Sequence, residues 1–159
     1  MKKILALMLI SLIFLSGCSS IPASVKDKAP STTKTTQVLP SYVVELIEAD
    51  ESFIFYFGNS WCSACQFVKA VNNEVVSRGK IPMYHIEMDK TSTKQLNMIY
   101  QYVIKPVATP TYIIVIDGVV IESFYPEVFV GDDETLDETH VSLYADNLIA
   151  YLTTKGLID

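Results

Sequence analysis

Two cysteines, Cys62 and Cys65, stand three positions apart behind Trp61 in the stretch FGNSWCSACQ. A pair at this spacing can bind a metal, close a structural disulfide or exchange disulfides with other thiols. The choice among these depends on the other ligands that the chain supplies and on the elements that position the two sulfurs.

A metal site is the first alternative. Zinc usually needs four ligands, commonly supplied as two such pairs. The chain offers His85 and His140, which lie far apart and match no zinc-finger or ribbon spacing. The acidic stretch PEVFVGDDETLDE lacks the ligand spacing of an EF-hand and is interpreted as a solvated loop. We therefore expect no metal at the pair.

A purely structural disulfide is the second alternative. A bridge that closes so short a loop removes little chain entropy from the unfolded state, so it would contribute little stability. Redox chemistry is the third alternative, and it accounts for more of the surrounding sequence.

The elements on either side of the pair favour redox chemistry. Residues 52–57, SFIFYF, are apolar throughout, as in a buried central strand, and from Cys62 the pattern becomes helical up to Arg78-Gly79. Cys62 would then lie at a helix N-terminus, where unpaired N–H groups and the helix dipole favour the thiolate. Cys65, one turn further in, would be more shielded and could resolve a mixed disulfide.

The rest of the pattern predicts one α/β domain. Two strands joined at Asp117-Gly118 indicate an antiparallel hairpin, whereas the strand, helix and strand around the cysteines indicate a parallel βαβ unit. The further expected elements are a helix over 41–50 capped by Ser41, a strand over 81–89 and a helix over 93–103. A last helix is expected to begin at a Thr135/Glu138 capping box and to end at Lys155-Gly156. The apolar face of this last helix consists of Val141, Tyr144, Leu148, Tyr151 and Leu152.

A second feature lies far from the pair in sequence. Thr109-Pro110-Thr111 stands just before a predicted strand, where proline is tolerated and where its peptide bond can be cis. A trans proline that ends a loop is the alternative interpretation.

Together, FIFYFGNSWCSACQ and TPTYIIVIDG resemble the thioredoxin-like superfamily over residues 38–157. The resemblance implies a thioredoxin-like α/β fold: a central mixed sheet with a parallel βαβ unit and a C-terminal antiparallel hairpin, flanked by helices. The phrase SFIFYFGNSWCSAC also resembles the bacteriocin transport accessory branch.

The resemblance also implies roles for individual residues. Trp61 would flank the active site, Cys62 would be the nucleophile and Cys65 the resolving thiol. Pro110 would be a cis-proline packed against the disulfide, and Thr109 would offer backbone groups to a bound peptide. No cofactor beyond the redox-active disulfide is implied.

Two positions depart from the pattern of standard thioredoxin. Ser63-Ala64 replaces the usual Gly-Pro between the cysteines, and Tyr56 stands where the family has a buried aspartate that assists proton transfer to the resolving cysteine. These changes leave the rate and the redox potential open, but both sulfurs are retained.

The N-terminus resembles a lipoprotein export signal. Lys2 and Lys3 precede a mostly apolar run over 4–15. As a helix this run would be about 18 Å long, which is too short to cross a hydrocarbon layer of roughly 30 Å. The run therefore predicts a signal peptide and not a transmembrane helix. The following LSGC resembles the bacterial lipobox, which implies lipidation of Cys18 and cleavage before it. Ordinary secretion with a chance cysteine is the alternative.

These boundaries predict a signal peptide over 1–17, a flexible lipidated tether over 18–37 that is rich in Ser, Thr, Lys and Pro, and a thioredoxin-like domain over 38–159. Removing 17 of 159 residues leaves 142, and the loss of two lysines takes the net charge from −6 to −8. So acidic a chain argues against nucleic acid as a partner and against electrostatic adhesion to anionic lipid.

The sequence thus predicts a membrane-anchored, extracytoplasmic thiol–disulfide oxidoreductase. Its expected partners are protein thiols and disulfides, an upstream electron donor or acceptor, and the membrane through the lipid on Cys18. One alternative is a binding or accessory module of an export or maturation system with secondary redox turnover. Another is a soluble cytosolic thioredoxin with an unprocessed N-terminus.

Overall fold

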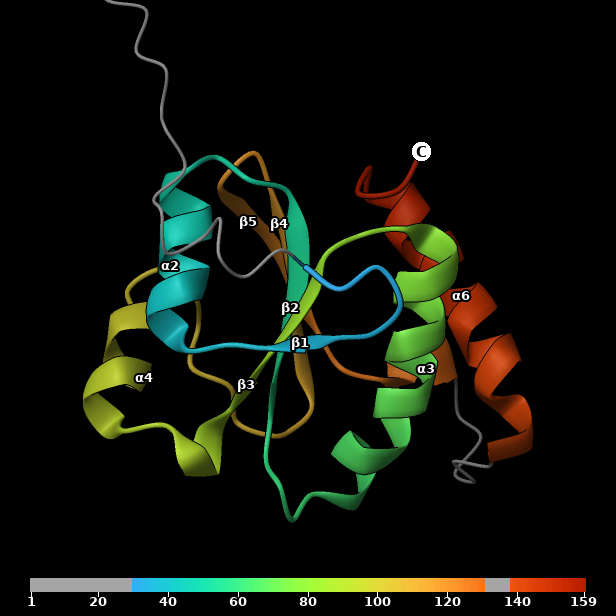
Figure 1. Ribbon diagram of the computed structural model, residues 1–159, viewed down its shortest axis with the longest axis horizontal. Coiled ribbons are helices and arrows are strands. Elements are labelled where there is room, and N and C mark those ends of the chain that lie inside the picture. Colours follow the sequence, from blue (N-terminus) through green and yellow to red (C-terminus); the bar gives the residue numbers. More distant parts are fainter. Residues whose placement is uncertain (1–29, 131–137) are drawn as a thin grey trace, which may run out of the picture.

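The computed structural model describes residues 30–130 and 138–159 as a five-stranded sheet between two layers of helices (Figure 1). The strand order is β1-β3-β2-β4-β5, with β1, β3 and β2 parallel and β4 and β5 antiparallel to their neighbours. The predicted mixed sheet, with its parallel βαβ unit and antiparallel hairpin, is confirmed. The strands are β1 (Thr36–Gln37), β2 (Phe53–Gly58), β3 (Met83–Glu87), β4 (Thr111–Ile116) and β5 (Val119–Phe124), and the α-helices are α2 (Pro40–Glu48), α3 (Ser63–Gly79), α4 (Thr93–Ile99), α5 (Glu127–Val130) and α6 (Val141–Thr154).

Strand β2 lies at the centre of the sheet and is buried along its whole length. Successive side chains of a strand point to opposite faces, so β2 supplies two separate clusters. Phe53, Phe55 and Phe57 pack in the cluster under α2 and α4, whereas Ile54 and Tyr56 pack in the cluster under α3 and α6.

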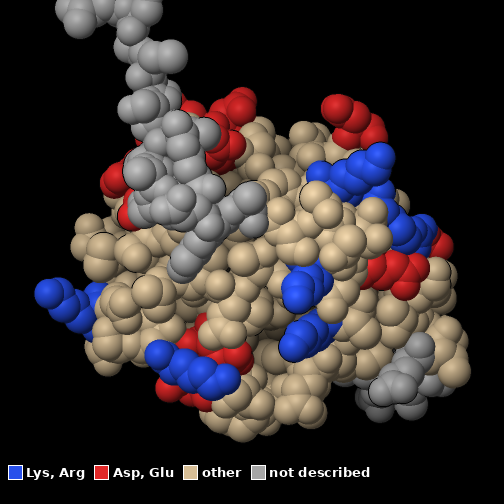
Figure 2. Space-filling model, viewed as in Figure 1, with Lys and Arg blue, Asp and Glu red and all other residues tan. Residues whose placement is uncertain are grey.

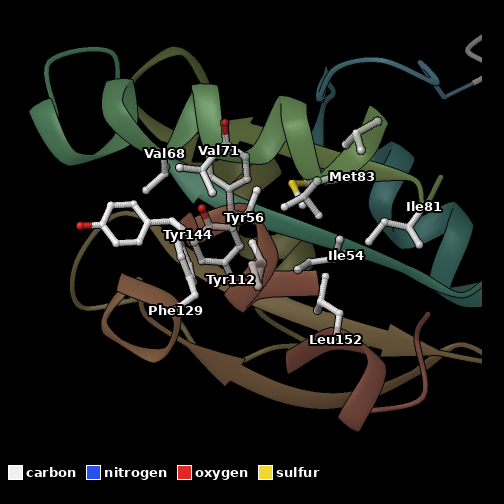
Figure 3. Packing of buried hydrophobic residues seen from close by; sticks show 14 of the residues in the cluster. Ile54, Tyr56, Val68, Val71, Ile81, Met83, Tyr112, Phe129, Tyr144 and Leu152 are labelled. Atoms are coloured by element: carbon white, nitrogen blue, oxygen red, sulfur yellow. The ribbon is translucent and has the colours of Figure 1, made fainter. Parts of the chain in front are cut away.

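The cluster beneath α3 and α6 is shown in Figure 3. The side chains of Tyr56 and Tyr112 lie in it side by side, with ring centroids 5.3 Å apart. The Tyr112 hydroxyl donates a hydrogen bond of 2.9 Å to Asn72 Oδ1 of α3, so this buried hydroxyl keeps a partner. The packing fixes α3, and with it the cysteine pair, against the sheet.

Strand β1 corrects the predicted tether. Its two residues pair in parallel with Tyr84 and His85 of β3, and the N–H of the buried Thr35 donates to Asn73 Oδ1 at 3.0 Å. Residues 35–37 therefore belong to the domain and not to the tether predicted over 18–37. Two residues are too few to show a strand period, which is why the pattern gave no sign of them.

Several helix ends also differ from the prediction. Helix α2 begins one residue early, with Pro40 in its first turn and Leu39 as N-cap, so Ser41 is not the cap. Helix α4 ends at Ile99 and not at 103, and α5 forms inside the stretch interpreted as a loop. Most of the predicted capping box, including Thr135, lies outside the described residues. Within the described ranges, no helix combines the length and apolar character that crossing a membrane requires.

Candidate active site

Cys62 and Cys65 form a disulfide at the first turn of α3, with their Cα atoms 5.2 Å apart. Cys62 is the N-cap of the helix, and its sulfur accepts a hydrogen bond of 3.1 Å from the Cys65 N–H. The predicted place of Cys62 at a helix N-terminus is confirmed. The two residues are almost equally exposed, at 9% and 8%, so the greater shielding predicted for Cys65 is not found in this oxidised state.

The loop before the disulfide is held by a residue that the sequence did not single out. Asp89, on the 3-10 turn Met88–Lys90 after β3, accepts a 3.0 Å hydrogen bond from the Ser60 N–H and a second hydrogen bond from the Ser60 hydroxyl. These bonds from Ser60 hold the pKa of the Asp89 carboxyl below its usual value. Gln66 Nε2 also donates to the Ser60 carbonyl, at 3.2 Å. The chain therefore enters α3 along a fixed path.

The loop that carries the proline lies directly against the disulfide. The Thr109–Pro110 peptide bond is cis, and the Thr109 carbonyl oxygen lies 3.3 Å from Cys62 Sγ. Asn59 Nδ2 donates to the Thr109 hydroxyl at 3.3 Å, which ties this loop to the one before the cysteines. The fold thus brings together two motifs that are 47 residues apart in sequence. A reduced Cys62 thiol would find its hydrogen-bond acceptor in this carbonyl.

Exposed apolar side chains occur in the two chain segments that meet at the disulfide. Trp61 immediately precedes Cys62 and is 75% exposed. In the chain segment before Thr109, Ile104 and Val107 are 82% and 92% exposed. Single exposed apolar residues are ordinary, and here three of them lie in the two segments that meet at the disulfide.

A pocket of about 230 Å³ lies on the sheet side of Cys65. Gly58 lines this pocket close to the disulfide, since a Cβ at that position would stand 3.7 Å from Cys65 Sγ. Tyr56, His85 and Glu87 line the same pocket, because β2 and β3 pair Tyr56 with His85 and Gly58 with Glu87. His85 was considered from the sequence only as a zinc ligand, and Glu87 was not singled out.

Burial sets the protonation of the two rings in this pocket. The Tyr56 ring stacks on the His85 imidazole, with centroids 5.4 Å apart and planes 19° apart. Burial raises the pKa of Tyr56 to about 12, so its hydroxyl keeps its proton at neutral pH. Burial lowers the pKa of His85, against the opposing effect of the Glu87 carboxylate, so the imidazole is neutral at pH 7.

The described part of the chain contains no group of three or more His, Cys, Asp or Glu side chains placed to hold a metal ion. His85 lies in β3, and His140 is the N-cap of α6.

No family model matches the sequence, and no curated protein matches it. Solved structures do match. A mutant thioredoxin from Halobacterium salinarum NRC-1 is 16% identical over 79% of this chain and 94% of that chain, with a TM-score of 0.54. Oxidised thioredoxin O2 from Arabidopsis thaliana is 15% identical over 79% and 97%, with a TM-score of 0.53, and thioredoxin from Trypanosoma brucei brucei is 10% identical over 77% and 95%, with a TM-score of 0.52. With its mixed sheet, its disulfide at the N-terminus of α3 and its cis-proline loop beside it, the chain has the thioredoxin-like fold.

Proposed function

We propose that this protein is a thiol–disulfide oxidoreductase that acts on cysteines of other proteins through the Cys62–Cys65 pair. The observation that carries the proposal is the placement of the disulfide at the N-cap of α3, with the Thr109 carbonyl 3.3 Å from the Cys62 sulfur. A helix N-terminus stabilises a thiolate, and the thiolate is the form of cysteine that attacks a disulfide.

The reduced protein would act in two displacements. The Cys62 thiolate attacks one sulfur of a substrate disulfide, which forms a mixed disulfide and releases the first substrate thiolate. The Cys65 thiolate then attacks Cys62 Sγ, so the Cys62–Cys65 bond forms and the second substrate thiolate leaves. The reverse sequence would oxidise a substrate dithiol. An upstream donor or acceptor of electrons resets the pair, and no other cofactor is required.

Protein substrates are favoured by the exposed apolar side chains of the segments that meet at the pair. Trp61, Ile104 and Val107 are largely exposed and lie in the two segments that meet at the disulfide. Tryptophan in particular is enriched among the residues that contribute most of the binding energy between two proteins.

Two cysteine variants test the proposal. In the reduced protein, Cys62→Ser should abolish the release of thiols from a disulfide-containing test protein, because the attacking thiolate is gone. Cys65→Ser should accumulate a mixed disulfide that mass spectrometry detects, because nothing resolves it. Cys18→Ala is the control, since its sulfur lies outside the pair, and it should leave turnover unchanged.

Unchanged turnover in Cys62→Ser would rule out this mechanism. If the protein's function in cells survived the loss of both cysteines, the domain would act instead as a binding module that presents a partner.

We further propose that the domain is a lipoprotein on the extracytoplasmic face of a bacterial membrane, anchored by acyl chains on Cys18. The LSGC motif and the basic, then apolar, N-terminus support this location. Cys18, the signal peptide over 1–17 and most of the proposed tether lie outside the described residues.

A further inference from the structure

Resolution of a mixed disulfide requires a proton to leave Cys65, because the thiolate is the nucleophile. Cys62, at the N-cap of α3, has the helix N-terminus to stabilise its anion, and its sulfur also accepts the Cys65 N–H. Cys65 lies inside the first turn, where it faces the pocket beside the sheet. The question is which group in that pocket can take its proton.

The pocket has room for a proton pathway. Its volume of about 230 Å³ can hold several water molecules, since each occupies about 30 Å³ in the liquid. The exposed residues Ser60 and Lys90 line it together with Cys65, so the pocket also reaches the protein surface. A proton that leaves Cys65 can therefore travel through water to a neighbouring base and on to solvent.

Five other titratable side chains face this region besides His85, and all five are unsuited to accept the proton. Lys69 of α3, Lys90 after β3 and Lys34, which lines the cavity on the far side of His85, are ammonium groups without a lone pair. Tyr56 of β2 keeps its proton, because burial raises its pKa to about 12. Glu87 Oε2 lies 3.6 Å from Lys90 Nζ, so this carboxylate is already engaged in an ion pair.

His85 is the remaining group, and its geometry suits a base. Its Nδ1 is buried and has no hydrogen-bond partner among the described residues, so the ring has unused capacity to bind a proton. Its Nε2 lies 4.0 Å from Glu87 Oε2, and the Tyr56 ring stacks on its face. A carboxylate beside the imidazole stabilises the cation that forms on proton uptake, and the stacked ring fixes its plane.

We propose that His85 accepts the proton of Cys65 through water in this pocket and that Glu87 stabilises the resulting imidazolium. This inference rests on the proposed function. In the step, neutral His85 takes H⁺ from the Cys65 thiol, and the thiolate attacks Cys62 Sγ. The Cys62–Cys65 bond forms as the bond from Cys62 to the substrate breaks. The substrate leaves as a thiolate, and His85 returns its proton to solvent.

A single-turnover experiment separates the two displacements. The reduced protein, in a Cys18→Ala background, is mixed with one equivalent of a symmetrical chromogenic aromatic disulfide. The first coloured thiolate reports attack by Cys62, and the second reports resolution by Cys65. The comparison is between His85→Gln and the matched control His140→Gln, which changes the chain's other histidine, the N-cap of α6.

We expect His85→Gln to slow the second phase at pH 7 by roughly tenfold or more, as for loss of a general base, and to leave the first phase unchanged. In the unsubstituted protein the second phase should slow as the pH falls through the lowered pKa of His85, below 6.5, because the protonated ring cannot accept H⁺. This inflection should vanish in His85→Gln. In His85→Ala, added imidazole should restore the second phase, and His140→Gln should behave as unsubstituted protein.

An unchanged second phase in His85→Gln would overturn the proposal, as would equal slowing of both phases, which indicates a structural role. Failure of imidazole to restore the second phase in a folded His85→Ala protein would do the same. If the unsubstituted protein gave no first phase, the proposed function itself would fail, and the two failures are thereby distinct.

Discussion

Asp89 holds the loop in front of the cysteine pair, although it lies on the turn that follows β3. Its carboxylate accepts the Ser60 N–H and the Ser60 hydroxyl, and Ser60 precedes Cys62 by only two residues. The Cys62 N–H itself donates to the Asn59 carbonyl at 3.2 Å. The position of the attacking Cys62 sulfur thus depends on Asp89, a charged residue of the turn that follows β3.

We predict that Asp89→Ala loosens this loop without unfolding the domain. Loss of two hydrogen bonds to a carboxylate should speed amide hydrogen exchange at Ser60 and Cys62 by about tenfold, while amides of β2 are unaffected. Asp146→Ala is the matched control, since it removes another exposed carboxylate with a hydrogen-bond partner, Arg78. Because the pKa of Asp89 lies below its usual value, the unsubstituted loop should stay protected at neutral pH and lose protection only in acid, as the carboxylate is protonated.

Equal exchange at Ser60 in Asp89→Ala and in the unsubstituted protein would show that the loop holds its path without this carboxylate.

At the scale of residues, the sequence identified those site residues whose amino-acid type and spacing already indicate a chemical role. Cys62, Cys65 and Pro110 were identified from spacing and from resemblance, and the structure places them together. Asp89 and His85 were not identified as site residues. Their relevance comes from the register of β3 against β2 and from the loop contacts, which no local pattern encodes.

At the scale of elements, the turn between β4 and β5 is determined both by its Asp-Gly sequence and by its packing against α2. Asp117 and Gly118 both have positive φ, at 48° and 72°, which the Asp-Gly signal predicts. Gly118 also packs against α2 and the turn after it: a Cβ at this position would lie 2.5 Å from the Ile47 carbonyl oxygen and 2.9 Å from Asp50 Oδ1. The glycine is needed for its conformation and for its lack of a side chain.

We predict that Gly118→Ala and Gly156→Ala differ in cost for this reason. Both glycines have positive φ, but a Cβ at Gly156 meets nothing within 4 Å. Gly156→Ala should therefore lower the free energy of unfolding by about 1 kcal/mol, the cost of left-handed backbone in alanine. Gly118→Ala should lower it by about 3 kcal/mol, because backbone of α2 must also move. Urea denaturation of both variants measures the difference, and equal losses would contradict the role given to the contact with Ile47.

The elements that the sequence could not predict are the short ones. The strand β1 has two residues, and the helix α5 has four, so neither shows a period. Helix α4 begins with a Ser92–Gln95 capping box, which fits the Ser-x-x-Gln pattern but was not used in the prediction. Long, strongly patterned elements such as β2 and α3 were predicted close to their observed bounds.

At the scale of the whole molecule, surface charge gives little reason for attachment to a membrane. Acidic and basic side chains are interspersed on the face shown in Figure 2, and the whole chain carries a net charge of −6. Anionic lipid attracts clusters of Lys and Arg, so an acidic domain needs another means of attachment. The proposed location therefore depends on the acyl chains expected at Cys18.

We predict that a metabolically supplied labelled fatty acid is incorporated into the unsubstituted protein in bacteria and is lost in Cys18→Ala. A diacylglycerol thioether has two acyl chains, which anchor stably where a single chain binds only marginally. The unsubstituted protein should therefore sediment with membranes, whereas Cys18→Ala should not carry the label. A double variant, Cys62→Ser with Cys65→Ser, should keep both label and sedimentation, because the redox pair has no part in lipidation.

Label retained in Cys18→Ala would place the modification elsewhere, and an unlabelled, secreted protein would favour cleavage by an ordinary signal peptidase. An unprocessed N-terminus found by mass spectrometry would instead favour the cytosolic alternative. Each outcome leaves the chemistry of Cys62 and Cys65 untouched, because the disulfide and the two packed clusters described here are formed by residues of the domain. What the anchor decides is the compartment, and hence whether the pair meets substrates that carry disulfides or substrates kept as thiols.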